Sequence, residues 1–333
     1  MEERIKERFH STILEEALRR YGVTPDRARL LDGFESFMYE MERAGEACIL
    51  RIGHSLHRDE RLIQAEVDWI NYLADGGASV ARAILSATGR LVEPIDDGHG
   101  RQFLATAFVK ARGQSPWKIG WTPELYETYG QLIGRLHALS QRYQPSNPAW
   151  QRPQWDDTEL LDVERFLPAD QPIVLQKYRD LLAYLRALPK SIEAYGLIHG
   201  DAHGSNFFVD ETGRITLFDF DDCAYSWYAN DLAIVLFYLI TNVPAAAEIT
   251  RGFMPHFLRG YRRENQLDPI WLKELPHFLQ LREIELYAVV HRSFDVEHID
   301  NAWCAAFMQG RRARIEHAVP YVEFDFEALA GEL

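Results

Sequence analysis

The spacing of apolar residues changes near residue 109 and divides this chain into two differently built parts. Before that point, helical stripes over Ile13–Tyr21 and Asp59–Leu73 accompany short apolar pieces separated by glycines. These pieces predict strands at Leu30–Leu31, Phe37–Tyr39, Ala47–Leu50, Leu91–Pro94 and Gln102–Val109. We therefore expect a β-rich N-terminal domain over residues 1–108.

Beyond residue 109 the expected structure is mainly helical. Apolar residues recur at helical spacing over Leu125–Leu139, Leu160–Phe166, Val174–Leu188, Leu232–Thr241 and Leu275–Phe294. The exception is Gly196–Phe220, where strand-like pieces flank loops rich in Asp, His, Gly and Asn. The whole pattern predicts an α+β, bilobal fold, with a small β-rich N-lobe and a larger helical C-lobe over residues 109–333.

Charge and composition restrict the partners of this chain. Its 333 residues include 36 Lys and Arg against 50 Asp and Glu, so the net charge of −14 disfavours nucleic acid and anionic membranes. No apolar run approaches the about 18 residues of a membrane span, and the N-terminus lacks a signal-peptide core. Cys48, Cys223 and Cys304 form no CxxC pair and fit reduced thiols. We expect a cytoplasmic protein without nucleic-acid or membrane partners, and a homodimer is compatible with the sequence.

The segment HGDAHGSN, from His199 to Asn206, carries the main chemical signal together with the later Asp219-Phe220-Asp221. An Asp, four residues, an Asn and then a hairpin ending in another Asp is the spacing of the kinase catalytic loop. One carboxylate can take a proton from a hydroxyl nucleophile, while the Asn and the second carboxylate hold a metal on a triphosphate. Oxygen donors of these types suit Mg²⁺.

On these residues the chain resembles the aminoglycoside phosphotransferase and choline kinase family, which has a protein-kinase-like fold and includes homoserine-kinase-type members. The resemblance implies an ATP-dependent kinase that phosphorylates an alcohol group, with ATP and Mg²⁺ as cofactors. It implies that Asp201 is the catalytic base and that His199 orients the catalytic loop. It also implies that Asn206 and Asp219 are the metal ligands.

Two further positions match the same family. Asp231 corresponds to an Asp that braces the catalytic loop, although a helix N-terminal acid explains it locally as well. His137, in Leu136-His137-Ala138-Leu139, matches a family Leu-His-x-Leu helix and is expected to be a structural histidine.

The expected nucleotide site lies in the N-terminal part. Leu31–Tyr39 occupies the place of the family's strand–loop–strand over the phosphates, and there Ser36 could donate to phosphate. A plain hairpin is the alternative, because Gly33 is the only glycine of this loop. Arg51 takes the strand position of the phosphate-binding Lys of protein kinases, and its guanidinium can grip phosphate oxygens at two points. Glu66 on the following helix is expected to pair with Arg51, and a solvated helix face is its alternative.

The acceptor site is expected near the C-terminal helices. The apolar helix over Leu275–Phe294 carries Arg282 and Glu285 near one face, and buried charges are costly unless they are paired. A surface ion pair is the simpler explanation. A cleft with both charges would suit a small zwitterion, so we expect a hydroxyl-bearing amino acid or amino alcohol as acceptor. The candidate acceptor-binding residues are Asp222, Tyr225, Trp227, Arg282 and Glu285.

Three other functions fit parts of this sequence. The segment Gly200–Gly204 also fits the GDxHG motif of metallophosphoesterases, but the later motifs of that class are absent. A protein kinase would need a Gly after Asp219-Phe220, an APE segment and room for an activation segment before Asp231. A catalytically dead kinase fold used as a binding module is suggested by Arg51 and by the glycine-poor loop, and an assay of nucleotide hydrolysis would separate it from an enzyme.

Overall fold

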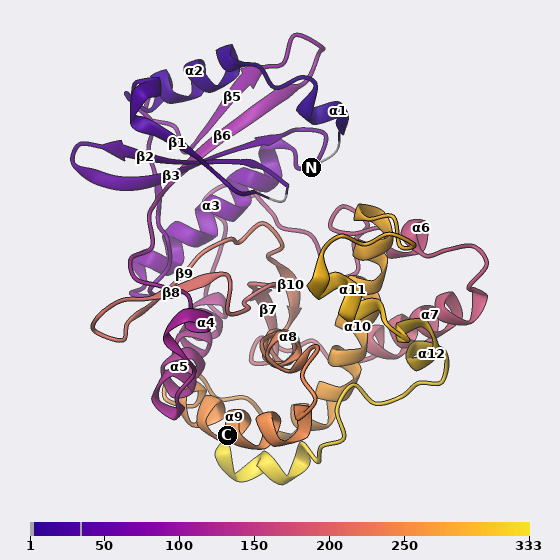
Figure 1. Cartoon of the computed structure of the whole chain (residues 1–333). Coiled ribbons are helices and arrows are strands. Elements are labelled where there is room, and N and C mark those ends of the chain that lie inside the picture. Colours follow the sequence, from indigo (N-terminus) through magenta and orange to yellow (C-terminus); the bar gives the residue numbers. More distant parts are fainter. Residues whose placement is uncertain (1–2, 34) are drawn as a thin grey trace. The chain divides into compact units, whose positions relative to one another are not determined.

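The computed structural model describes residues 3–33 and 35–333, and it separates into two compact units (Figure 1). The first unit consists of Met1–Gly113, Tyr143–Arg152 and Thr216–Asp221. The second unit consists of Gln114–Arg142, Pro153–Ile215 and Asp222–Leu333. Two segments from late in the chain therefore belong to the first unit, and one of them carries Asp219 and Asp221.

The first unit is built on a six-stranded antiparallel sheet with the order β1-β2-β3-β6-β4, in which β5 also pairs with β6 (Figure 1). The strands are β1 (Ala28–Leu31), β2 (Phe37–Arg43), β3 (Glu46–His54), β4 (Ala83–Ile84), β5 (Val92–Asp96) and β6 (Gln102–Val109). The helices are α1 (Glu3–Lys6), α2 (Ser11–Arg20) and α3 (Glu60–Asp75), with a 3₁₀ turn at Pro25–Arg27. The Asp59 side chain caps α3 by accepting a hydrogen bond of 2.8 Å from the Leu62 N–H.

The alternation of side chains along β3 decides which residues enter the core. Leu50 and Ile52 are fully buried in one apolar cluster with Leu18 and Tyr21 of the α2 region. Because successive side chains of a strand point to opposite faces, Arg51 projects from the other face of the sheet. The strand pattern therefore places one cation on the face opposite to the apolar core.

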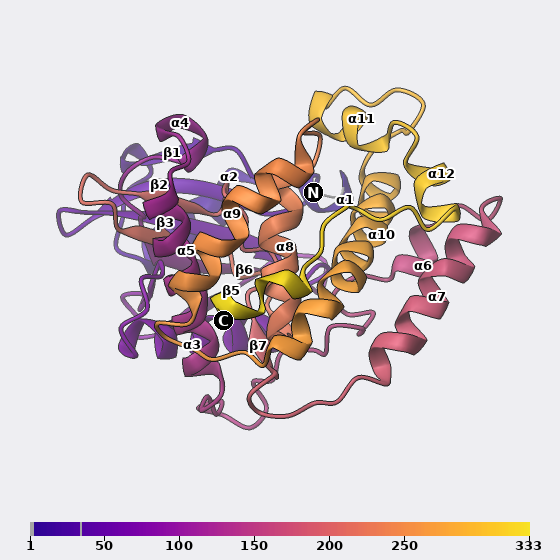
Figure 2. The same ribbon diagram turned by 90° about the horizontal axis from the view of Figure 1, so that it is seen from below.

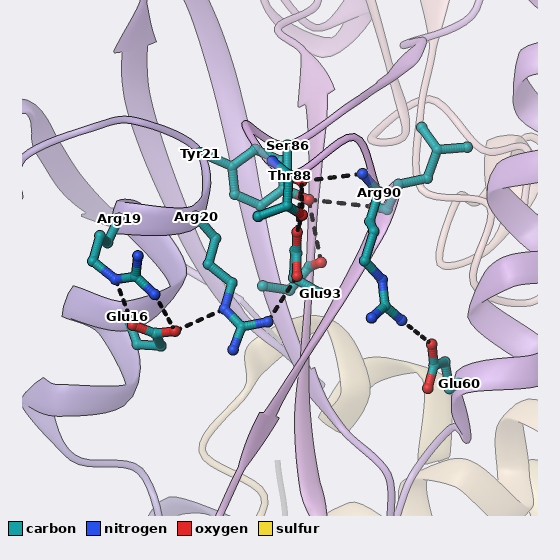
Figure 3. Close-up of polar contacts among 11 residues, drawn as sticks. Glu16, Arg19, Arg20, Tyr21, Glu60, Ser86, Thr88, Arg90 and Glu93 are labelled. Carbon is teal, nitrogen blue, oxygen red and sulfur yellow. Dashed lines mark hydrogen bonds and ion pairs between the residues drawn. The ribbon is translucent and has the colours of Figure 1, made fainter.

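A buried carboxylate ties α2 to this sheet (Figure 3). Glu93 of β5 is completely buried and accepts hydrogen bonds from Ser86 Oγ at 2.5 Å, from Arg20 at 2.8 Å and from Thr88 Oγ1. Arg20 also donates to Glu16 within its own helix at 2.8 Å. The Glu93 carboxylate is thus satisfied by neutral hydroxyls and one cation, as a buried charge requires.

The second unit is mainly helical, and its helices are grouped around α8. The bounds are α4 (Pro116–Ile119), α5 (Pro123–Ser140), α6 (Val163–Phe166), α7 (Pro172–Arg186), α8 (Tyr228–Ile240), α9 (Ala246–Tyr261), α10 (Leu275–Ser293), α11 (Ala302–Met308) and α12 (Arg311–Glu316). 3₁₀ turns cover Pro269–Glu274 and Glu327–Glu332. Every residue of α8 except Tyr238 is buried, and α8 lies between α9 and α10 (Figure 2). A helix that is apolar on all sides needs such a central position.

Helices α5 and α9 pack at very short range because glycines lie at their contact. An ideal Cβ on Gly130 would lie 1.9 Å from the Phe257 carbonyl oxygen, and one on Gly260 would lie 1.9 Å from that of Glu127. Short strands follow the first helices of this unit. β7 (Tyr195–Ile198) pairs antiparallel with β10 (Ala224–Trp227), and β8 (Phe207–Val209) pairs with β9 (Ile215–Leu217), of which Thr216 and Leu217 are already counted in the first unit. Among the described residues, no helix has the length and apolar character needed to cross a membrane.

Candidate active site

The loop after β7 is fixed by backbone geometry. Gly200 has a φ of +79°, and an ideal Cβ there would lie 2.5 Å from the Asp222 carbonyl oxygen. The backbone N–H groups of His199 and Gly200 both donate to the Asp231 carboxylate at 2.9 Å. The turn therefore requires glycine, and a carboxylate at the start of α8 holds it from behind.

Asp231 is itself part of a buried chain of hydrogen bonds. Its Oδ2 lies 3.1 Å from His137 Nε2, and His137 Nδ1 lies 2.8 Å from the Tyr261 hydroxyl. Burial opposes ionisation of Asp231, but the hydrogen bond from His137 and the bonds from the loop backbone keep its pKa below the usual range. These contacts agree with a loop-bracing role for Asp231 and a structural role for His137.

The Asp201 carboxylate lies among donors at the centre of this loop. It is 3.2 Å from His203 Nε2, it accepts a hydrogen bond of 3.1 Å from Asn206 Nδ2, and Arg282 donates to its other oxygen. Burial would raise the pKa of Asp201, but the charges of His203 and Arg282 outweigh burial and hold that pKa well below its usual value. Asp201 is therefore ionised and able to orient or accept a proton.

The geometry of Asn206 leaves one metal-binding atom available. Its Nδ2 donates both to the Asp201 carbonyl oxygen, at 2.9 Å, and to the Asp201 carboxylate. The side-chain amide nitrogen is thereby used within the loop, whereas no described residue donates a hydrogen bond to the side-chain carbonyl oxygen. An amide oxygen beside an ionised carboxylate suits a hard divalent cation.

Arg282 of α10 lies closer to the candidate base than the sequence indicates. It donates to Asp201 and, at 2.8 Å, to the Tyr238 hydroxyl, while Glu285 is 3.7 Å away. The side chains of Arg282 and Glu285 are only 15% and 19% exposed, so a plain surface ion pair does not describe them. Burial raises the pKa of Glu285 to about 7, and the charge of Arg282 only partly offsets this effect.

The other candidate acceptor residues differ in exposure. Asp222 and Tyr225 are half-buried. Trp227 is completely buried, its Nε1 donates to the Pro189 carbonyl at 2.8 Å, and its ring packs at 5.4 Å from that of Trp155. A side chain inside the core cannot contact an acceptor, so the structure does not support Trp227 as an acceptor-binding residue.

In the first unit, Arg51 and Glu66 form a buried double contact. Arg51 donates to the two Glu66 oxygens at 2.8 and 2.7 Å and to Thr106 Oγ1 at 3.3 Å. The Glu66 side chain is 1% exposed, so it does not lie on a solvated helix face. Burial lowers the pKa of Arg51, but the charge of Glu66 outweighs it and keeps the guanidinium charged. Ser36 is half-buried in the β1–β2 loop, with its hydroxyl 3.5 Å from where a Cβ on Gly53 would lie.

Asp219 and Asp221 also lie in the first unit. Asp219 has a left-handed φ of +65°, and the ring of Phe220, which follows it, packs against Trp69 at 5.4 Å between centroids. Asp221 lies 3.4 Å from His57 Nε2 and 3.3 Å from Arg58 Nε. No motif in the sequence marks His57 or Arg58, and their adjacency to the end of β3 is the signal that could have pointed to them.

This chain is similar to known proteins over most of its length. The model of the phosphotransferase enzyme family matches residues 26–274. An amicoumacin kinase of Bacillus subtilis (strain 168) is 40% identical over 330 residues, which are 98% of each chain. A solved amicoumacin kinase in complex with AMP-PNP, Ca²⁺ and Ami matches with a TM-score of 0.93 and 37% identity, over 99% of this chain and 100% of that one. A microcompartment-associated aminopropanol kinase matches with a TM-score of 0.75 and 27% identity, over 93% and 98% of the two chains.

Proposed function

This chain belongs to the phosphotransferase enzyme family, and on that premise we propose that it transfers the γ-phosphoryl group of ATP to a hydroxyl group held beside Asp201. Family membership confirms the predicted resemblance and the enzyme class, a phosphotransferase with an alcohol group as acceptor. The similarity to solved kinases confirms the α+β protein-kinase-like fold class. Both similar kinases act on small molecules by their names, which supports a small-molecule kinase over the metallophosphoesterase and protein kinase alternatives. The assay of nucleotide hydrolysis still has to separate an enzyme from a catalytically dead binding module.

The main support for the proposal is the loop from His199 to Asn206, which hydrogen bonds and ion pairs hold in one conformation. Asp231 and Gly200 fix its backbone, and His203, Asn206 and Arg282 hold the Asp201 carboxylate in one orientation. A general base must be held in this way if it is to aim a hydroxyl at a phosphorus atom. Because its pKa is low, Asp201 acts mainly by orienting the hydroxyl and takes the proton as the O–P bond forms.

ATP and Mg²⁺ fit the residues present. The similar amicoumacin kinase holds AMP-PNP and Ca²⁺, which agrees with the expected cofactors. The Asn206 amide oxygen and the Asp219 carboxylate would bind Mg²⁺, and the bound cation neutralises charge on the transferring phosphoryl group. Arg51 would bind the α- and β-phosphates, Glu66 would orient its guanidinium, and Ser36 would add a donor from the β1–β2 loop.

For the acceptor, we propose an amine-bearing alcohol that contacts Arg282, Glu285, Asp222 and Tyr225. The support is an α10 helix that offers a half-buried guanidinium and a half-buried carboxylate next to the candidate base. The similar aminopropanol kinase acts on an amino alcohol by its name, and the amicoumacin kinase matches over nearly all of this chain. Amicoumacin is therefore the first acceptor to test and aminopropanol is the second.

The test is an acceptor screen with the purified protein, ATP and Mg²⁺. Release of ADP is followed with amicoumacin, aminopropanol, homoserine, choline and a mixture of Ser/Thr peptides, and mass spectrometry identifies the phosphorylated product. We expect phosphorylation of at least one amine-bearing alcohol, with no product when Mg²⁺ is omitted. Phosphorylation of the peptides alone, or of none of these compounds, would contradict the proposal.

A further inference from the structure

An ion cluster joins the β1–β2 loop to the segment after β3, and its members are not among the residues proposed to bind ATP, Mg²⁺ or the acceptor. His57 Nε2 lies 2.8 Å from Glu35 Oε2 and 3.4 Å from Asp221 Oδ2. The three side chains are 19%, 28% and 23% exposed, and all three residues belong to the first unit. Among the described residues, they are a group whose candidate ligand atoms lie within 4.8 Å of one another.

The surroundings of the cluster are cationic. Asp221 faces Arg58 at 3.3 Å and Arg51 at 3.9 Å in addition to His57. Burial lowers the pKa of His57, but the carboxylates of Asp221 and Glu35 outweigh burial and raise it to about 9. At neutral pH, two guanidinium groups and one imidazolium therefore lie around Asp221.

The negative charge of Glu35 is unexpected in a loop that is proposed to cover phosphate groups. Its carboxylate points to a cation beside Arg51, the residue proposed to bind the triphosphate. A phosphate group and the Glu35 carboxylate would repel each other strongly if both contacted His57 in this partly buried setting. The carboxylate must therefore move before phosphate oxygens reach His57.

The contact geometry makes such a movement feasible. His57 Nε2 faces both carboxylates, but neither contact is a well-aligned hydrogen bond. Glu35 also comes from a loop, whereas Asp221 is held by two arginines as well.

We propose that Glu35 is a displaceable internal anion: its carboxylate holds His57 in the nucleotide-free enzyme, and the phosphates of ATP replace it there. His57 is then a further phosphate-binding residue, and Glu35 lowers the apparent affinity for nucleotide. The inference rests on the proposed use of ATP by this chain. It differs from a metal site at Glu35, His57 and Asp221, because a metal would need the carboxylate that the phosphates must displace.

A displaceable anion and a metal ligand predict opposite changes in the apparent Kd for MgATP on Glu35→Gln. This substitution removes the charge of the side chain and keeps its size. If the closed form holds about three quarters to nine tenths of the molecules, removing the competitor lowers the apparent Kd for MgATP roughly four- to ten-fold. Titration calorimetry with MgATP, without any acceptor, measures this change. His57→Gln should raise the Kd by a similar factor, and Glu35→Gln should no longer tighten binding when it is added to His57→Gln.

Glu42→Gln is the matched control, because Glu42 lies exposed on the β2 strand that follows the same loop. Its Kd should equal that of the parent. An unchanged or higher Kd for Glu35→Gln would overturn the inference, and a higher Kd together with weaker Mn²⁺ binding would assign the group to a metal instead. If the parent itself fails to bind MgATP, the proposed function fails together with the inference. If the parent binds and Glu35→Gln does not tighten binding, only the inference fails.

Discussion

Replacing Glu66 by Gln tests whether Arg51 and Glu66 form a desolvated ion pair that stabilises the first unit. The variant keeps the volume of the side chain but removes the charge that faces Arg51, and the two side chains are only 8% and 1% exposed. Removing one partner of a buried pair costs about 3–5 kcal/mol, because the other charge remains buried without compensation. At about 2–4 °C per kcal/mol for a unit of this size, the melting midpoint should fall by roughly 6–20 °C.

Circular dichroism during heating measures this shift in the melting midpoint. Two further variants show whether the unpaired buried charge is its cause. The double variant Arg51→Met/Glu66→Leu should recover most of the lost stability, since no charge is left unpaired, but it should bind MgATP far more weakly than the parent. Glu164→Gln is the control, because Glu164 pairs with Arg179 at 2.6 Å while both are largely exposed, at 43% and 53%. It should cost less than about 1 kcal/mol. An equally small loss for Glu66→Gln, or parental ATP affinity in the double variant, would refute the reasoning.

Three further predictions concern other parts of the chain. Burial opposes ionisation of Glu93, but hydrogen bonds from Ser86, Thr88 and Arg20 hold its pKa below the usual value. The ionised Glu93 therefore stabilises the fold above the pKa of the unfolded state, and this stabilisation is lost as pH falls through the pKa of the folded state. Glu93→Gln should therefore lower stability at pH 7 and flatten the acid side of the stability profile, as measured by urea unfolding between pH 3 and pH 7. Gly200→Ala forces a left-handed alanine against a carbonyl, so it should cost roughly 1–3 kcal/mol and most of the turnover; parental kinetics would contradict this. Asp219→Ala should raise the Mg²⁺ concentration for half-maximal turnover at least about ten-fold, and an unchanged Mg²⁺ titration would remove Asp219 from the metal site.

The sequence was sufficient to predict those features that depend on the residue spacing within a single segment. The helical spacing over Leu125–Leu139 and Leu275–Phe294 correctly predicted α5 and α10, since amphipathic and buried helices leave a periodic apolar pattern. The Asp201-to-Asn206 spacing indicated a kinase-type catalytic loop, and in the structure this loop brings the two side chains into contact. The helix α9 was missed, since Pro255 in its interior is typical of a helix end.

Contacts between distant segments could not be predicted in the same way. Arg282 reaches Asp201 across 81 residues of sequence, so its direct contact with the candidate base was not foreseen. The same is true of His57, which meets Glu35 on one side and Asp221 on the other. Trp227 stands close to the metal motif in the sequence, but the pairing of β10 with β7 places it in the core.

The most direct test of the central claim is the rate of phosphoryl transfer by Asp201→Asn, measured in single turnovers with the acceptor identified in the screen. The substitution keeps the side-chain shape and removes the charge that orients the hydroxyl and takes its proton. The account predicts MgATP affinity within about three-fold of the parent and a transfer rate lower by roughly 10²–10⁴-fold. A folded variant that transfers phosphate within a few-fold of the parental rate would contradict it.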